Sequence, residues 1–169
     1  KQKIEYVLRC TNSLIKSIKY ILKKNKNIKI QLNIIDNGSP KDDMNKIEKM
    51  LSNTDISYEM FNHNNDEYKD LITKQNNIET FCNLSSLLKS FNLGKSADDL
   101  VYFVEDDYLH FETCLEEMVS TFERISSQIK KDIFLCSADY PYLYSKNDKT
   151  NILIGNKRHW RTIDKSLCT

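Results

Sequence analysis

The chain has 169 residues, enough for one domain with a substantial hydrophobic core and too few for two ordinary domains. Its 25 basic and 24 acidic residues give a formal net charge of +1, so overall charge favours neither a membrane nor a nucleic-acid partner, and we expect no nucleic acid. No apolar run approaches the roughly 18 residues that span a bilayer, so we expect no transmembrane segment.

The beginning of the chain predicts a short strand followed by a helix. Residues 4–9 are rich in apolar and β-branched side chains and predict the strand. The helix is predicted by apolar residues at helical spacing, with lysines on the opposite face: Leu14, Ile15, Ile18, Ile21 and Leu22.

A second strand and a turn follow. Apolar and polar residues alternate from Ile28 to Ile34, which predicts a strand that stops at a turn over residues 36–40. Ser39 is placed to cap a helix whose first residue is Pro40. Carboxylates in its first turn and apolar residues up to Leu51 support that helix.

The rest of the chain continues the alternation. Residues 56–61 predict a third strand, residues 62–66 a loop, and the apolar spacing over 81–91 a long helix. The apolar run 101–104 then ends in three adjacent carboxylates. A helix of about five turns is predicted over 111–129. Residues 133–136 predict a further strand, and the tail from residue 142 is less regular.

Strands that alternate with helices are typical of an α/β fold with a largely parallel sheet. We therefore expect a three-layer α/β/α sandwich with a mostly parallel, Rossmann-like central sheet, formed as a single domain over residues 1–169. Functional groups should gather at the carboxyl ends of its strands. Polar residues that fall at predicted strand ends are Arg9, Asp36, Glu105, Asp106, Asp107 and Asp139.

The acidic triplet Glu105, Asp106 and Asp107 indicates a cation. Like charges at the mouth of a buried strand repel each other and resist desolvation. Carboxylate oxygens suit Mg²⁺ or Mn²⁺, whose remaining positions can take substrate phosphates. On a strand, Glu105 and Asp107 would face one way and Asp106 the other, unless the backbone turns. The alternative is an acidic surface turn that caps the next helix.

The turn after the second strand is a candidate binding loop. The Asp36 carboxylate can accept hydrogen bonds from a base or a ribose, and the tight turn lets a ligand approach the backbone. A purely structural role as turn and helix cap is compatible with binding.

The order of these motifs resembles nucleotide-sugar glycosyltransferases of the GT-A fold, similar to family 2, over about residues 4–140. In that family the first turn usually reads Asp, Asp or Asn, Gly or Ser, then Ser, and the second motif is Asp-X-Asp or sometimes Glu-Asp-Asp. The resemblance implies metal-dependent, inverting transfer of a hexose from a UDP- or GDP-linked donor to a glycan or lipid-linked acceptor. Residues 1–109 would be the nucleotide-sugar-binding half, and 110–169 part of an acceptor-binding half, shortened at its C-terminus.

The resemblance also implies residue roles on the donor side. Asp36, with Asn37 beside it, would contact the nucleotide base, and Arg9 would line the same pocket. Lys74 is a candidate for the basic residue that many members place before the long helix.

For the triplet, the resemblance makes Asp107 the main metal ligand. Glu105 and Asp106 would hold the ribose, the sugar or a metal-bound water. The Mn²⁺ or Mg²⁺ ion would act as a Lewis acid on the leaving diphosphate.

The tail offers weaker candidates. Asp139 is a candidate general base or acceptor contact. His159 is a candidate metal or phosphate ligand, with Trp160 as a stacking platform, although a lone histidine is more often structural. His63 and His110 are interpreted as structural.

Two other functions compete with glycosyl transfer. A related nucleotidyltransferase would need a glycine-rich loop after the first strand, and residues 10–13 contain no glycine. A non-catalytic nucleotide-sugar-binding domain would lack the acceptor half.

In inverting members the base commonly lies farther beyond the acidic motif than Asp139 does.

The cysteines indicate the compartment. They are odd in number, contain no CxxC pair and lie mostly in apolar runs: Cys10, Cys82, Cys114, Cys136 and Cys168. This pattern is typical of reduced thiols in a reducing compartment rather than of disulfides or a zinc site. We expect a cytoplasmic protein, with a peripheral association with a membrane left open.

Overall fold

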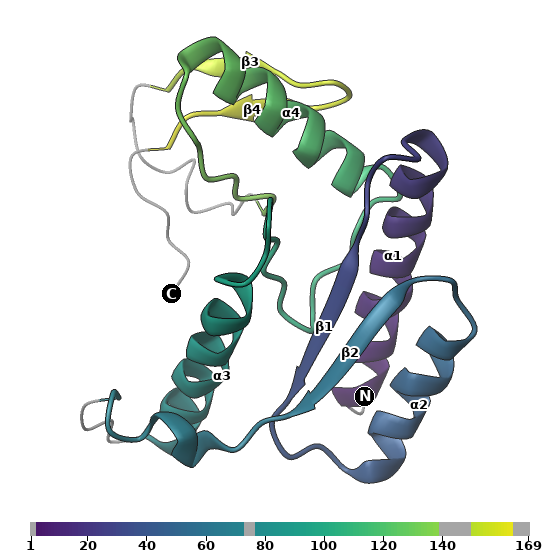
Figure 1. Cartoon of the computed structure of the whole chain (residues 1–169), viewed down its shortest axis with the longest axis vertical. Coiled ribbons are helices and arrows are strands. Elements are labelled where there is room, and N and C mark those ends of the chain that lie inside the picture. The colour runs from purple at the N-terminus through teal and green to yellow at the C-terminus, as the bar shows by residue number, and fades with distance from the viewer. Residues whose placement is uncertain (1–2, 73–76, 139–149, 164–169) are drawn as a thin grey trace.

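The computed structural model describes residues 3–72, 77–138 and 150–163 (Figure 1). Its elements in chain order are α1 (Lys3–Lys24), β1 (Gln31–Asp36), α2 (Lys41–Ser52), β2 (Ser57–Asn62), the short 3₁₀ helix η1 (Asn65–Tyr68), α3 (Ile78–Gly94), α4 (Cys114–Ile129), β3 (Ile152–Ile154) and β4 (His159–Arg161). β1 pairs with β2 in parallel, and β3 pairs with β4 antiparallel.

The predicted three-layer sandwich is wrong. The described part of the chain has four α-helices and two separate two-stranded sheets in place of one central sheet. Leu32, Ile34 and Tyr58 of the parallel pair pack against the core. The side chains that alternate with them are polar and exposed: Gln31, Asn33, Ser57 and Glu59. A sheet buried on both faces needs apolar residues on both, so these strands suit a sheet covered on one face.

The first predicted strand is also wrong, because residues 4–9 belong to α1. Val7 and Leu8 lie three and four residues after Ile4, and all three continue the apolar stripe of the predicted helix. No glycine or proline interrupts the 22 residues of α1. Arg9 consequently lies on a helix and not at a strand end.

The β1–α2–β2 unit confirms the second strand, the next helix and the third strand. The two strands run in register from Gln31 beside Ser57 to Asp36 beside Asn62. The helix begins one residue later than predicted, with Pro40 in the N-cap position and no side-chain cap. Ser39 therefore does not cap it, and its backbone N–H is bound by the Asp36 carboxylate instead.

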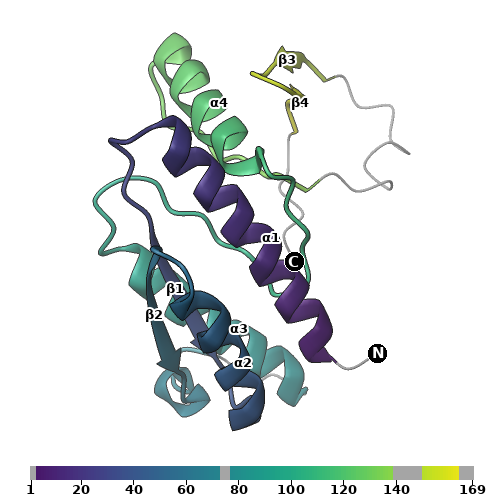
Figure 2. The same ribbon diagram turned by 90° about the vertical axis from the view of Figure 1, so that its right-hand side faces the viewer.

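The main hydrophobic core surrounds α1. This helix contacts both α2 and α4 and lies between them (Figure 2). The buried residues of the core come from three helices and from the residue just before β2: Leu14, Ile15, Ile18, Ile21, Ile47, Leu51, Ile56, Leu115 and Met118. The predicted helices over 81–91 and 111–129 are confirmed as α3 and α4.

The strands predicted over 101–104 and 133–136 are wrong. Neither segment forms a strand in the described part of the chain, and residues 101–104 are 36–45% exposed. Their aromatic side chains contact other groups through their rings. Phe103 packs edge-on against Phe91 of α3, with ring centroids 5.1 Å apart. Tyr102 places its hydroxyl 3.0 Å from Nε2 of His110.

Candidate functional site

The acidic triplet lies beside the N-terminal half of α1. Residues 106 and 107 form a turn, so Asp106 and Asp107 line one shallow hollow together with Lys3, Tyr6 and Val7. The backbone turns at these residues, which is the case in which the sequence did not predict that the two carboxylates face opposite ways. Asp106 Oδ2 lies 3.4 Å from Lys3 Nζ. Both side chains are at least half exposed, so this ion pair adds little stability.

Three small side chains on one face of α1 hold the segment that carries the triplet. Their hydrogen bonds are Cys10 Sγ to the Glu105 carbonyl oxygen (3.4 Å), the His110 N–H to Ser13 Oγ (3.0 Å), and the Leu115 N–H to Ser17 Oγ (3.0 Å). Residues three and four apart lie on the same side of a helix. Helix α1, and not a strand, thus determines where the carboxylates lie.

The pKa of the Cys10 thiol depends on the charge of the nearby carboxylates. Burial raises the pKa of Cys10 above its ordinary value of 9.0, and the negative charges of Asp106 and Asp107 raise it further. A hydrogen bond from the Tyr108 backbone opposes this rise in pKa. Cys10 is therefore a protonated donor and not a reactive thiolate.

We predict that removing the charges of Asp106 and Asp107 accelerates alkylation of Cys10. Asp106→Asn combined with Asp107→Asn removes two charges that disfavour the thiolate, so iodoacetamide should label Cys10 a few-fold faster in the folded protein. Peptide mass spectrometry measures the rate. Cys82 provides the internal control, because it is also a free thiol, although it is partly exposed whereas Cys10 is buried. An unchanged ratio of the two rates would contradict the placement of the carboxylates.

The Asp36 turn ends β1 and is held by its own hydrogen bonds. Both carboxylate oxygens of Asp36 lie 3.2 Å from the Ser39 nitrogen. The side-chain amides of Asn37 and Asn65 exchange two hydrogen bonds, of 2.8 and 2.7 Å. Asn37 therefore fastens the turn to η1, whereas Asp36 keeps lone pairs for a further donor.

His63 lies directly after β2 and is buried beside this turn. Its backbone N–H donates to the Asp36 carbonyl oxygen at 2.7 Å. Ring Nε2 is 2.8 Å from Ser85 Oγ, whose hydroxyl donates to the Asn65 carbonyl oxygen at 3.1 Å. The Ser85 hydroxyl uses its one proton in the bond to Asn65, so in the bond with His63 the Nε2–H group is the donor and Ser85 Oγ is the acceptor. Nδ1 is 3.6 Å from Glu67 Oε2.

The order Ser85, His63, Glu67 has the form of a nucleophile, base and acid. A substrate cannot reach these residues, because Ser85 and the His63 side chain are both 0% exposed, and a catalytic role is therefore excluded. The serine proton is also already given to a carbonyl oxygen. We interpret the cluster as structural, in agreement with the interpretation of His63 from the sequence.

The two predicted motifs lie at the same end of the molecule. Helix α1 runs opposite to β1, so its first turns and the carboxyl end of β1 share one end (Figure 1). Within the described residues, no hydrogen bond or ion pair joins Asp36 or Asn37 to the triplet. Arg9 is exposed and lies one turn after Tyr6 on α1, which places it next to the hollow.

A second site is built around Glu117 of α4, which the sequence analysis did not identify. Glu117 is only 3% exposed. Its carboxylate accepts hydrogen bonds from the turn between β3 and β4 and from the only tryptophan: Asn156 N (2.9 Å), Lys157 N (2.6 Å), Arg158 N (3.3 Å) and Trp160 Nε1 (3.1 Å). The hairpin is thus fastened to α4 by one carboxylate.

The pKa of Glu117 reflects this environment. Burial acts to raise the pKa of the carboxyl group, but the hydrogen bonds from Trp160 and the three backbone N–H groups outweigh burial. The pKa of Glu117 is therefore below its ordinary value of 4.5. The group is ionised near neutral pH and acts as the anion that the turn binds.

The remaining predicted residues divide into two groups. His159 is exposed on β4, and Trp160 gives its indole N–H to Glu117 and packs against the core, so its ring is not a free stacking platform. Within the described ranges, no group of three or more His, Cys, Asp or Glu residues is arranged to hold a metal ion. Lys74 and Asp139 lie outside the described residues.

Comparisons with known proteins add no assignment. No protein-family model, curated protein or solved structure matches the chain. In the part of the chain that the structure describes, no helix has both the length and the apolar character needed to cross a membrane.

Proposed function

We propose that the hollow beside α1 binds the metal-bound diphosphate of a nucleotide sugar and that the chain transfers the sugar. The observation that carries this proposal is that Asp106 and Asp107 line one hollow with Lys3. Carboxylates suit a divalent cation, whereas Lys3 and the neighbouring Arg9 suit phosphate oxygens. The hollow therefore combines the two kinds of group that a metal–diphosphate needs.

The proposal predicts that cation and nucleotide bind together. Two carboxylates alone make a weak site, because Mg²⁺ and Mn²⁺ prefer about six oxygen ligands and usually take several from substrate phosphates or water. When bound, such an ion would neutralise the charge that builds on the leaving diphosphate. Lys3 and Arg9 would orient the same diphosphate through its oxygens.

The Asp36 turn supports a base or ribose contact. The Asp36 carboxylate accepts a hydrogen bond from one backbone N–H, and its remaining lone pairs can accept hydrogen bonds from a ligand. The turn shares one end of the molecule with the hollow (Figure 1). The Asn37 side chain forms hydrogen bonds with Asn65 and with Ser86 of α3, so it has a positioning role in this proposal.

We predict that Asp107→Asn weakens binding of UDP or GDP in the presence of Mn²⁺ by roughly 10- to 100-fold, since a charged ligand is lost from the site. Isothermal titration calorimetry measures this affinity, with and without Mn²⁺. Asp99→Asn removes the same charge from an exposed position outside the hollow and should bind like the unmodified protein. Binding that needs no metal, or that Asp99→Asn weakens equally, would refute the proposed site.

A binding module without catalysis is the second candidate. The exposure of the hollow favours it, because Asp106 is 50% exposed and glycosyl transfer profits from exclusion of water. Release of UDP or GDP from the nucleotide sugar distinguishes the two. Hydrolysis that depends on Asp107 supports a transferase, whereas full affinity without hydrolysis supports the module.

A further inference from the structure

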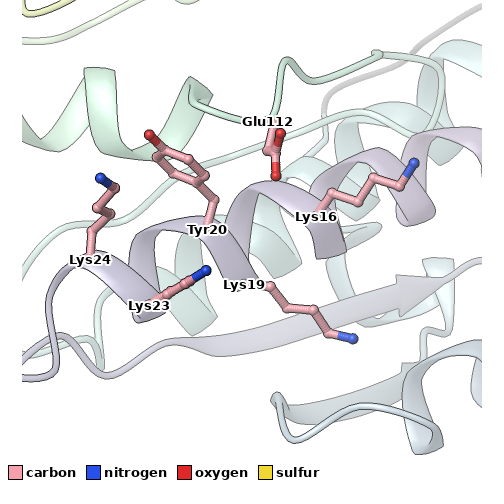
Figure 3. Close-up of a pocket in the computed structure, with 6 residues that line it drawn as sticks. All are labelled: Lys16, Lys19, Tyr20, Lys23, Lys24 and Glu112. Atoms are coloured by element: carbon pink, nitrogen blue, oxygen red, sulfur yellow. The ribbon is translucent and has the colours of Figure 1, made fainter.

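Six cations form one surface at the C-terminal half of α1 and the β3–β4 turn. We call this surface the basic face, and its cations are Lys16, Lys19, Lys23, Lys24, Lys157 and Arg158. The four from α1 line a hollow with Tyr20 and Glu112, and Figure 3 shows Glu112, from the segment before α4, between Tyr20 and Lys16. Lys157 Nζ lies 4.7 Å from the centroid of the Tyr20 ring, which makes the turn continuous with the hollow.

The charge of the basic face is largely uncompensated. Four of the six basic residues of α1 belong to the basic face, and the one acidic residue of the helix, Glu5, lies in its first turn at the other end. Within the described residues, Lys16, Lys19 and Lys23 form no ion pair. Lys157 is paired with Glu116, with Nζ and Oε2 2.5 Å apart. The six cations therefore outnumber the two carboxylates beside them, Glu112 and Glu116, and this side of the molecule carries an excess of positive charge.

Apolar side chains flank the basic face. Leu109 is 71% exposed and Phe111 is 68% exposed, and both precede Glu112 in the same segment. The Arg158 guanidinium lies 4.5 Å from the centroid of the Phe111 ring, so the apolar rim is continuous with the cations. Lysines beside exposed apolar residues are typical of surfaces that bind the lipid–water interface.

The aromatic rings argue against single-stranded nucleic acid as the partner. Such a partner needs free ring faces on which bases stack. Lys157 lies over the Tyr20 ring and Arg158 over one face of the exposed Phe111 ring, so neither ring offers both of its faces to bases. Leu109 instead offers an aliphatic side chain that can enter lipid.

We infer that the basic face docks the protein on an anionic lipid membrane. Phosphate and carboxylate groups of the lipids would bind the lysines, and Leu109 and Phe111 would enter the interface. Each basic residue near an anionic leaflet strengthens binding roughly fivefold. The attraction is between exposed charges, so salt should weaken it.

Co-sedimentation of the full chain with vesicles tests this inference. We expect binding to phosphatidylcholine vesicles that contain about one third phosphatidylserine, and none to pure phosphatidylcholine. Lys19→Gln with Lys23→Gln should weaken binding roughly 25-fold. Lys41→Gln with Lys49→Gln removes the same charge from exposed positions of α2 and should leave binding unchanged.

A second variant and a competitor make the outcome decisive. Leu109→Gln should weaken vesicle binding without lowering the thermal midpoint, because the side chain is 71% exposed. Equal loss in the α2 control variant, or equal binding to pure phosphatidylcholine, would overturn the inference. So would tighter binding to an RNA homopolymer that depends on Lys19 and Lys23. Nucleotide affinity, measured without vesicles, is a separate readout.

Discussion

Glu117→Gln is expected to release the β3–β4 hairpin from α4. Both carboxylate oxygens of Glu117 accept hydrogen bonds from backbone N–H groups. In the glutamine variant, one of these oxygens is replaced by an NH₂ group, which cannot accept, whichever way the amide is turned. Leaving buried donors without acceptors costs about 2–4 kcal/mol when several are involved. The hairpin has three-residue strands, and its other contacts with the rest of the chain include the Lys157–Glu116 ion pair, two cation–ring contacts and the packing of Trp160.

Trp160 reports this release directly, because it is the only tryptophan and donates its indole N–H to Glu117. The emission of Glu117→Gln should shift to longer wavelength as the indole becomes exposed to water. Glu123→Gln, at an exposed position of the same helix, should leave emission unchanged. Identical spectra for Glu117→Gln and the unmodified protein would show that the carboxylate does not hold the hairpin.

The same contact should depend on pH. The pKa of Glu117 is lower in the folded protein than its ordinary value of 4.5, so the ionised carboxylate stabilises the fold above that value. This stabilisation is lost as the pH falls below 4.5 and through the lowered pKa of the folded state. Tryptophan emission should shift over that acidic range in the unmodified protein and remain already shifted in Glu117→Gln.

Leu51→Ala is expected to cause the largest loss of global stability. Leu51 is 0% exposed at the end of α2 and belongs to the core around α1. Removing a buried leucine side chain and leaving a cavity costs about 2–5 kcal/mol. For a chain of this length, the thermal midpoint should fall by roughly 10 °C.

Leu71→Ala is the matched control, since Leu71 is 71% exposed. Its unfolding midpoint in urea should differ little from that of the unmodified protein. Circular dichroism at increasing urea concentrations measures both variants. A Leu51→Ala variant as stable as Leu71→Ala would mean that α2 does not pack on α1 as the structure describes.

Helices are the part of this fold that the sequence predicts best. Apolar spacing identifies α2, α3 and α4. Helices α2 and α4 bury apolar residues of their stripes, whereas Ser85 is the only buried residue of α3. The start of α1 is mistaken for a strand because a window of six residues covers less than two helical turns. In so short a window, β-branched residues favour a strand although the period is helical.

The error in the sheet has a different cause. The polar residues Lys29, Gln31 and Asn33 between the isoleucines and leucine already indicate a sheet with one covered face. The alternation of predicted strands and helices favours a three-layer fold only if the polar side chains on one face of the strands are left out of account. The apolar run 101–104 is typical of a buried strand, but a sequence does not state which distant strand would pair with it.

Only part of the candidate site could be predicted from the sequence. Three carboxylates after an apolar run identify the acidic turn, but Cys10, Ser13 and Ser17 are ordinary residues until a distant segment packs on them. Glu117 carries a signal, because it lies four residues before Thr121 and shares its buried helix face. A carboxylate at such a position requires donors from elsewhere in the chain.

The contacts of α1 also constrain the order in which the protein can fold during synthesis. Cys10 binds a residue 95 positions later, Ser17 one 98 positions later, and Tyr20 one 137 positions later. At roughly 5–20 residues per second, the ribosome needs on the order of 10 s to add the last of these partners. Until then α1 can pack on α2 but must leave its other polar face to water or to a chaperone.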